Sequence, residues 1–368
     1  MGVEMEGGKP GWYDALNGLP GLLGSSVAET LELCRVLEDI SARAARFHRS
    51  VSLMDEAVQL ARTLTAVLTD NEAVWQQAGE NLPVWNALSD AREAYRASLM
   101  NGATGGKTQL DADEIDHMLA VWSAYVRRAV EKAMKLGGGL CPTYFAYNVT
   151  QYHEDEAGLH PEAFQLVKMP DFLEGQVRWL RLDKTPAEKR QLLTAVKESR
   201  LYDRKLNMYK VNAALGEASY EIGRAHAFTP GWLENESIWL HMEYKYLLEE
   251  LRSGLYSEFC EDFHMAAVPF LDPAMYGRSP LENSSFIASS ANPGPVIHGK
   301  GFVARLSGST AEFLSIWQIM MLGRTLFSVK DDQLTLTLGY DIENLTDPAR
   351  CKGYHGEVVM DHFGRQKP

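Results

Sequence analysis

The stretch GWYDALNGLPG, residues 11–21, places a single acid, Asp14, between aromatic residues and a turn rich in glycine and proline. A helical run opens shortly after it, behind the favourable N-cap residue Ser26. A carboxylate on a short loop, framed by Trp12 and Tyr13, is suited to protonating the oxygen of a glycosidic bond. Asp14 is therefore a candidate general acid, and an aspartate in an ordinary turn is the alternative.

Bulk composition excludes several classes of function. The 368 residues carry 49 acidic and 36 basic side chains, a net charge of −13, which argues against nucleic-acid binding. No long apolar run and no basic leader is present, so we expect no membrane association and a cytoplasmic protein. The cysteines are far apart and lack a C-x-x-C pair, which predicts no metal site and no disulfide framework. They are Cys34, Cys141, Cys260 and Cys351.

Apolar residues at helical spacing dominate the first half of the chain. They predict two helices within residues 26–68, separated near residues 48–50, and a further helical stretch over residues 71–100. A long helix is expected from the cap Asp111 to the glycines at 137–139. Aromatic and β-branched residues follow, and they predict a strand or an aromatic loop between Cys141 and Tyr152.

The second half continues the helical pattern. Helices are expected over about residues 161–182, 187–198, 211–222, 235–259 and 309–321. A capping box, Thr185 with Glu188, opens the second of these. After them, alternation of Leu334, Leu336 and Leu338 predicts a strand, with residues 358–360 as its possible partner. Helix pairs joined by long loops favour a mainly α fold of stacked antiparallel pairs.

The stretch TPGWLENESIWLH, residues 229–241, combines groups that suit a sugar. Glu234 and Asn235 offer acidic and amide groups to hydroxyls, and Trp239 offers a ring face. His241 falls inside the helix that follows, as a candidate ligand or as a buried histidine bonded to a carbonyl.

The stretch GFVARLSGST, residues 301–310, predicts an anion site. Ser307 and Gly308 precede a helix whose free N–H groups and positive dipole end attract anions, and a glycine lets an anion approach the backbone. The same composition is also typical of a helix cap without a ligand.

Together these segments resemble the inverting glycoside phosphorylases of the cellobiose phosphorylase type, glycoside hydrolase family 94. Residues 11–17 are similar to the family's acid motif D-W-N-D-x-x-N, and residues 234–241 to its E-N-G-G-x-x-x-H. Residues 307–309 are similar to its T-G-T ahead of a helix. The long insertion between the first two motifs is most similar to the 1,2-β-oligoglucan phosphorylase group.

The resemblance implies the second half of an (α/α)6 barrel over residues 1–325 and a C-terminal β-strand segment over residues 326–368. It implies a glycosyltransferase-type enzyme that splits β-glucan oligosaccharides with inorganic phosphate as co-substrate and needs no cofactor. The implied general acid is Asp14, and the implied phosphate ligands are His241, Ser307 and Gly308. The implied sugar contacts are Trp12, Tyr13, Glu234, Asn235 and Trp239. The family's upstream half, with its phosphate-binding arginine, has no counterpart here, so the expected partner is that missing half or a second copy of the chain.

Two departures from the family motifs leave other functions open. Gly11 stands where the family has a sugar-binding aspartate, and Glu236 replaces a glycine close to the expected phosphate, which adds negative charge. An inverting hydrolase needs a second carboxylate about 6.5–9.5 Å from the acid. Glu236 could be that base, so hydrolysis or transglycosylation is one alternative. An inactive, assembly-dependent fragment is another, because half a barrel exposes apolar helix faces.

Overall fold

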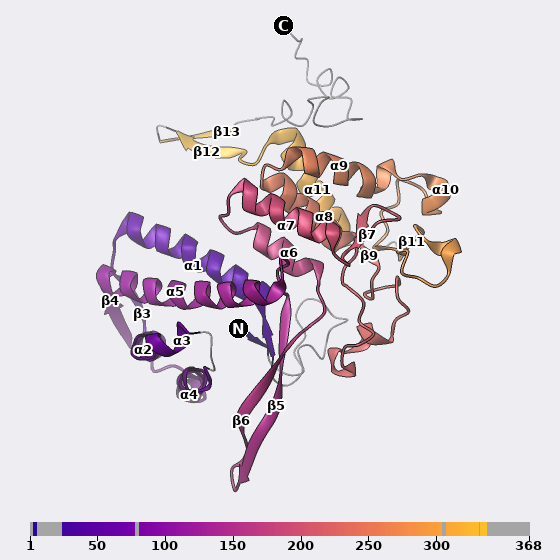
Figure 1. The fold of residues 1–368 in the computed structure, drawn as a ribbon. Helices are drawn as coiled ribbons and strands as arrows, with labels where there is room; N and C mark the ends of the chain where they lie inside the picture. Colours follow the sequence, from indigo (N-terminus) through magenta and orange to yellow (C-terminus); the bar gives the residue numbers. More distant parts are fainter. Residues whose placement is uncertain (1–2, 6–23, 78–80, 304–306, 331, 337–368) are drawn as a thin grey trace. The chain divides into compact units, whose positions relative to one another are not determined.

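The computed structural model of the chain describes residues 3–5, 24–77, 81–303, 307–330 and 332–336 (Figure 1). The fold is mainly helical, with 53% helix, 18% strand and 11 helices in these described ranges, which confirms the predicted class. None of the helices in these ranges is long and apolar enough to cross a membrane. The chain divides into two compact units, described separately below, and the predicted boundary at residue 325 stays a prediction.

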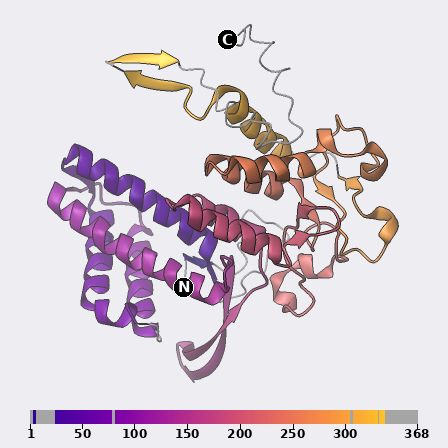
Figure 2. The same ribbon diagram turned by 45° about the horizontal axis from the view of Figure 1, so that its top comes forward.

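The N-terminal unit contains residues 24–138 and 144–168, together with strand β1. Its longest helices, α1 and α5, lie side by side and antiparallel (Figure 2). Ser26 caps α1 by accepting from the Glu29 amide, and Asp111 caps α5 by accepting from the Glu114 amide. The helices of this unit are α1 (Val27–Phe47), α2 (Asp55–Asp70), α3 (Glu72–Trp75), α4 (Leu82–Leu99) and α5 (Ala112–Gly137). The helices predicted from the apolar pattern of this half are therefore confirmed.

Two antiparallel sheets complete the N-terminal unit. The first pairs β3 (Val51–Met54) with β4 (Lys107–Leu110). The second has the order β1-β2-β5-β6 and consists of β1 (Val3–Met5), β2 (Gly24–Ser26), β5 (Tyr144–Asp155) and β6 (Gly158–Lys168). Strands β5 and β6 form a long hairpin whose outer part is exposed on both strands.

The hairpin shows which structure residues 141–152 adopt and overturns part of the helix predicted over residues 161–182. The segment 141–152, predicted as a strand or an aromatic loop, is largely strand β5. The helix predicted over residues 161–182 is wrong in its first half, because residues up to Lys168 pair with β5 and helix α6 (Leu173–Leu180) begins only afterwards. Hydrogen bonds to a neighbouring strand outweigh local helix preference here.

The C-terminal unit contains residues 139–143 and the chain from residue 169 onward. Its central helix α8 is buried along almost its whole length and packs against α6, α9 and α11. The helices besides α6 are α7 (Pro186–Glu198), α8 (Leu240–Arg252), α9 (Tyr256–Ala266), α10 (Pro273–Tyr276) and α11 (Ser307–Leu322). Its strands are β7 (Tyr202–Asp203), β8 (Met208–Tyr209), β9 (Ile238–Trp239), β10 (Phe286–Ile287), β11 (Gly301–Phe302), β12 (Phe327–Lys330) and β13 (Gln333–Leu336).

Several predictions for this half need correction. The helix expected over residues 235–259 is wrong at its start, because residues 238–239 form strand β9 and α8 begins only at Leu240. The rest is two helices, because Gly254 adopts a left-handed φ of 73° and ends the first. The helix expected over residues 211–222 is absent, apart from a 3₁₀ turn at its end, since the segment forms loops around buried polar groups. The C-terminal strand β13 is confirmed and pairs with β12, while residues 358–360 lie outside the described residues.

The cysteines that the structure describes are in two different states, free and disulfide-bonded. Cys34 and Cys141 are buried free thiols, and burial raises the pKa of Cys141, which keeps it protonated. Cys260, however, is disulfide-bonded. One such bond is no framework, but it removes the argument from cysteine usage for a reducing compartment.

Candidate functional site

The second and third motifs lie together in the C-terminal unit. The small sheet with the order β11-β10-β9 carries the chain directly into α8, and the Leu240 amide donates to the Ser285 carbonyl at the junction. His241 therefore emerges in the first turn of α8, as a half-buried side chain. The acid motif, with Trp12, Tyr13 and Asp14, lies outside the described residues.

A row of stacked aromatic rings supports His241. Trp232 stacks on Phe302 at 3.7 Å, Phe302 on Phe286 at 5.5 Å, and Phe286 on Trp239 at 5.7 Å between ring centroids. The His241 ring meets Trp239 edge-on at 5.8 Å. Trp239 is only 8% exposed, so in this structure it positions His241 rather than offering an open face to a sugar. The half-buried Trp232, at the other end of the row, is the more accessible ring.

His241 and Gly308, predicted from different motifs, are in direct contact. A Cβ atom on Gly308 would overlap the His241 Nδ1 atom and would lie 2.7 Å from its Cε1 atom. The space that the glycine leaves is therefore filled by the imidazole, whereas the sequence suggested that it would admit an anion. Next to it, the buried Ser309 hydroxyl is within hydrogen-bond distance of the Asn283 amide nitrogen, at 3.1 Å. The Ser307 side chain lies outside the described residues.

Opposite charges meet beside this contact. Glu312 on α11 places its Oε1 atom 3.6 Å from His241 Nε2 and 4.0 Å from Lys245 Nζ. Burial alone would raise the pKa of Glu312, but the adjacent His241 and the charges of Lys245 and Arg181 hold it below its usual value. The first two turns of α8 and α11 thus bring the Glu312 carboxylate beside His241 and Lys245.

Neighbouring arginines add to the positive charge. Burial lowers the pKa of Lys245, and the charges of Arg178 and Arg181 act in the same direction. Arg178 pairs with Glu174 at 3.3 Å, and Arg181 pairs with Glu249 at 3.0 Å. The motif comparison missed Lys245 and Arg178, because neither belongs to a motif and helix packing alone brings α6 beside α8.

Glu236, the residue that replaces the family's glycine, is held in a buried ion pair. Its carboxylate lies 2.7 Å from Lys210 Nζ, and both side chains are close to fully buried. Its φ of 56° is left-handed, a conformation that glycine adopts most readily. Its amide donates to Asn212 Oδ1, and Asn212 Nδ2 donates to the Glu234 carbonyl. Lys210 therefore neutralises the negative charge that the motif comparison placed near phosphate.

The predicted sugar contact Asn235 also has a structural role. Its Nδ2 atom donates to the Phe228 carbonyl, while its buried Oδ1 atom has no hydrogen-bond partner among the described residues. The amide fixes the loop that carries Glu234 and Glu236. Its oxygen keeps the capacity to accept one more hydrogen bond.

A group of buried acids lies on α8 and α9 and was missed entirely in the sequence analysis. Glu243, Glu250 and Asp262 are all buried. Tyr209 donates through its amide to Glu243 and through its hydroxyl to Asp262. Burial raises the pKa of Glu243 to about 8, and burial together with Asp262 raises that of Glu250. A sequence pattern cannot reveal such acids, because a glutamate on an amphipathic helix normally faces water.

No protein-family model matches this chain, and no curated protein matches it. The function must therefore be argued from the motifs and from the geometry of the C-terminal unit.

Proposed function

We propose that this chain supplies the C-terminal half of an (α/α)6 barrel in an inverting phosphorylase of β-glucosides. The contact between His241 and Gly308 carries the proposal, because two motifs far apart in the sequence meet at the start of α11. The left-handed φ of Glu236 is a second support, since it suits the glycine of the family motif.

The anion would bind where Glu312 now lies. Glu312 lies beside His241 and Lys245, so it acts as an internal substitute for a bound anion. Phosphate carries more charge than a carboxylate and would compete for the same cations and for the amide groups that open α11. Its oxygen would attack the anomeric carbon and form a sugar 1-phosphate with inversion.

The leaving glucan oxygen needs a proton in the same step. Asp14 is the proposed donor: the bond between C1 and the glycosidic oxygen breaks while the acid proton moves to that oxygen. Phosphate is already anionic and needs no general base. The reaction therefore needs one carboxylic acid and one anion site, and the upstream half of the barrel would complete the sugar pocket.

Phosphorolysis is favoured over hydrolysis by the state of Glu236. A hydrolase would need this carboxylate as a base for water, but it is buried and held 2.7 Å from Lys210 Nζ, so it is not presented to an attacking water. Incubation with β-glucan oligosaccharides, with and without phosphate, separates the two. A sugar 1-phosphate formed only with phosphate supports the proposal, while free glucose formed without phosphate identifies a hydrolase.

Phosphate binding tests the site independently of turnover. Inorganic phosphate should raise the stability of the full chain, by about 2.7 kcal/mol at a concentration 100 times the dissociation constant. His241→Ala should remove most of this gain, because the imidazole is a proposed ligand. His264→Gln is the matched control, an exposed histidine on α9 of the same unit. Thermal unfolding at matched ionic strength measures the effect, and an equal gain in all three proteins would refute the site.

Glu312→Gln should strengthen phosphate binding roughly tenfold, which corresponds to about 1.4 kcal/mol. The substitution keeps the shape of the side chain and removes the charge that competes for His241 and Lys245. Titration with phosphate, followed by calorimetry, gives the dissociation constant directly. Weaker binding in this variant would mean that Glu312 organises the site instead of occupying it.

A further inference from the structure

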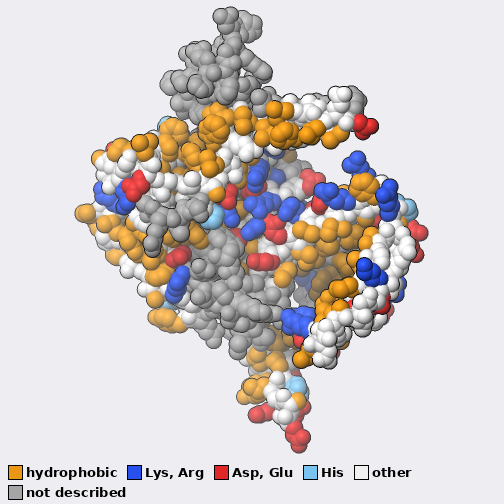
Figure 3. Space-filling model, turned by 180° about the vertical axis from the view of Figure 1, so that it is seen from behind, with side chains coloured by type: hydrophobic (Ala, Val, Ile, Leu, Met, Phe, Trp, Pro, Cys, Tyr) orange, Lys and Arg blue, Asp and Glu red, His pale blue; other side chains and the backbone are white. Residues whose placement is uncertain are grey.

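The tip of the β5–β6 hairpin gathers histidine and carboxylate side chains on one face. His153 and His160 are directly opposite each other in the strand register. Asp155 lies two residues beyond His153 on the same strand and so points to the same side of the hairpin. Glu162 lies at an irregularity in the register, and its contact with His153 places its carboxylate beside that ring. Figure 3 shows histidine and acidic side chains together at the end of this hairpin, at the bottom of the view.

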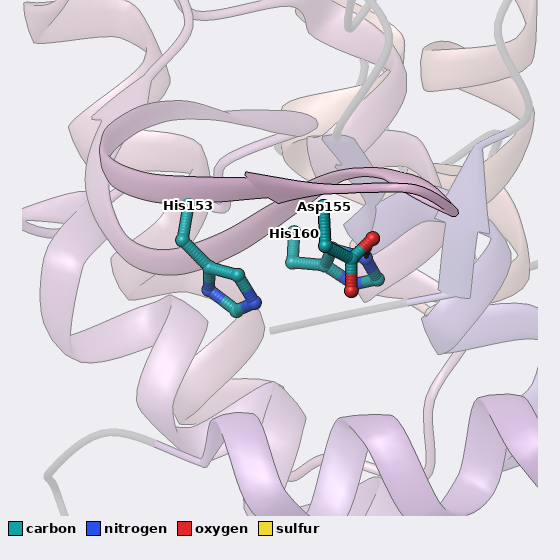
Figure 4. Close-up of side chains that lie close together, drawn as sticks. All are labelled: His153, Asp155 and His160. Carbon is teal, nitrogen blue, oxygen red and sulfur yellow. Dashed lines mark hydrogen bonds and ion pairs between the residues drawn. The ribbon is translucent and has the colours of Figure 1, made fainter.

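The four side chains already contact one another. His160 Nε2 lies 2.8 Å from Asp155 Oδ1, and His153 Nδ1 lies 2.8 Å from Glu162 Oε1. The two imidazoles stack, with centroids 4.9 Å apart and planes inclined by 13°. One ligand atom from each of His153, Asp155 and His160 lies within 4.8 Å of the others (Figure 4).

These distances are close to those of a metal site. Zinc binds histidine nitrogen and carboxylate oxygen at about 2.0–2.2 Å, which places neighbouring tetrahedral ligand atoms roughly 3.3–3.6 Å apart. The widest separations here must shrink by about 1.5 Å, which rotation of exposed side chains can supply. A metal ion between His160 Nε2 and Asp155 Oδ1 would displace the proton of their hydrogen bond, because both atoms would then bind the ion.

Glu162 is placed to fix the orientation of the His153 ring. Histidines that bind metals usually donate their second ring N–H to a carboxylate, which fixes the tautomer and the ring orientation. Glu162 holds His153 in this way through Nδ1. Asp155 supplies the carboxylate ligand, and its contact with His160 Nε2 holds it beside that imidazole.

We propose that His153, Asp155 and His160 bind a divalent transition-metal ion, preferably zinc, with Glu162 as a positioning residue. Two imidazoles and one carboxylate form a ligand set typical of zinc, and water would fill the fourth position. The spacing of cysteine and histidine along the chain predicted no metal site. The hairpin pairing creates this ligand set across two strands, where spacing along the chain does not reveal it.

Calorimetric titration of the untagged full chain with Zn²⁺ tests the proposal. We expect saturable binding at one equivalent, loss of that binding in His153→Gln and His160→Gln, and unchanged binding in the control His264→Gln. Glu162→Gln should bind Zn²⁺ about 10- to 100-fold more weakly, as is typical when the partner of a metal-bound histidine is removed. Co²⁺ should bind at the same site and give the visible absorption of a tetrahedral complex.

His153 and Glu162 are exposed and His160 is half-buried, and none of them lies in the core, so the variants should fold, which circular dichroism checks. The proposal is overturned if the unmodified chain binds no Zn²⁺ at one equivalent. It is also overturned if both hairpin histidine variants bind Zn²⁺ as tightly as the control, since the ion would then lie elsewhere.

Discussion

Lys210→Met should lower the free energy of unfolding by about 3–5 kcal/mol, the usual cost of breaking a buried ion pair from one side. Lys210 and Glu236 are both largely inaccessible to water, and their charged atoms are 2.7 Å apart. Without the ammonium group, the Glu236 carboxylate would remain buried and uncompensated in a loop whose backbone is already left-handed. Urea unfolding followed by circular dichroism measures the loss.

Two further variants isolate the cause of that loss. Lys210→Met combined with Glu236→Gln should recover much of the stability, because no unpaired charge then remains buried. Lys184→Met is the control for an exposed ion pair, where Lys184 lies 3.9 Å from Glu188, and it should cost at most about 1 kcal/mol. If the double variant is as unstable as Lys210→Met, the lysine acts through packing of its alkyl chain rather than through charge.

Glu243→Gln should change how stability depends on pH. In the folded protein burial raises the pKa of Glu243 from 4.5 to about 8, so the native state keeps a proton that the unfolded chain has already lost. Between these values the native state binds more protons, and the free energy of unfolding therefore falls as the pH rises. The contribution of one such group is about 1.4 kcal/mol for each pH unit, or several kcal/mol in total.

The glutamine cannot titrate, yet its carbonyl oxygen can still accept the Tyr209 amide hydrogen that Glu243 accepts now. The stability difference between Glu243→Gln and the unmodified protein should stay constant below about pH 4.5 and grow in favour of the variant up to about pH 8. Urea titrations across this range test the prediction. Glu261→Gln, an exposed neighbour on α9, is the control. Parallel pH profiles for all three proteins would show that Glu243 is ionised at neutral pH.

Local signals in the sequence determined the helical framework. Ser26, Asp111 and the capping box of Thr185 with Glu188 mark helix starts that the structure confirms. These starts are predictable because a cap satisfies backbone groups of its own helix and needs no distant partner. The apolar spacing that follows each cap reports a buried face for the same local reason.

Tertiary structure decided the features that depend on contacts between residues far apart in the chain. Strand β6 exists because β5 supplies hydrogen-bond partners, and the same pairing brings His153 opposite His160. The sequence named His241 and Gly308 separately, but only the packing of α11 on α8 brings them into contact. Lys210 could not be predicted as the partner of Glu236 for the same reason. The energy of a buried charge depends on the groups that folding places around it, and these come from distant parts of the chain.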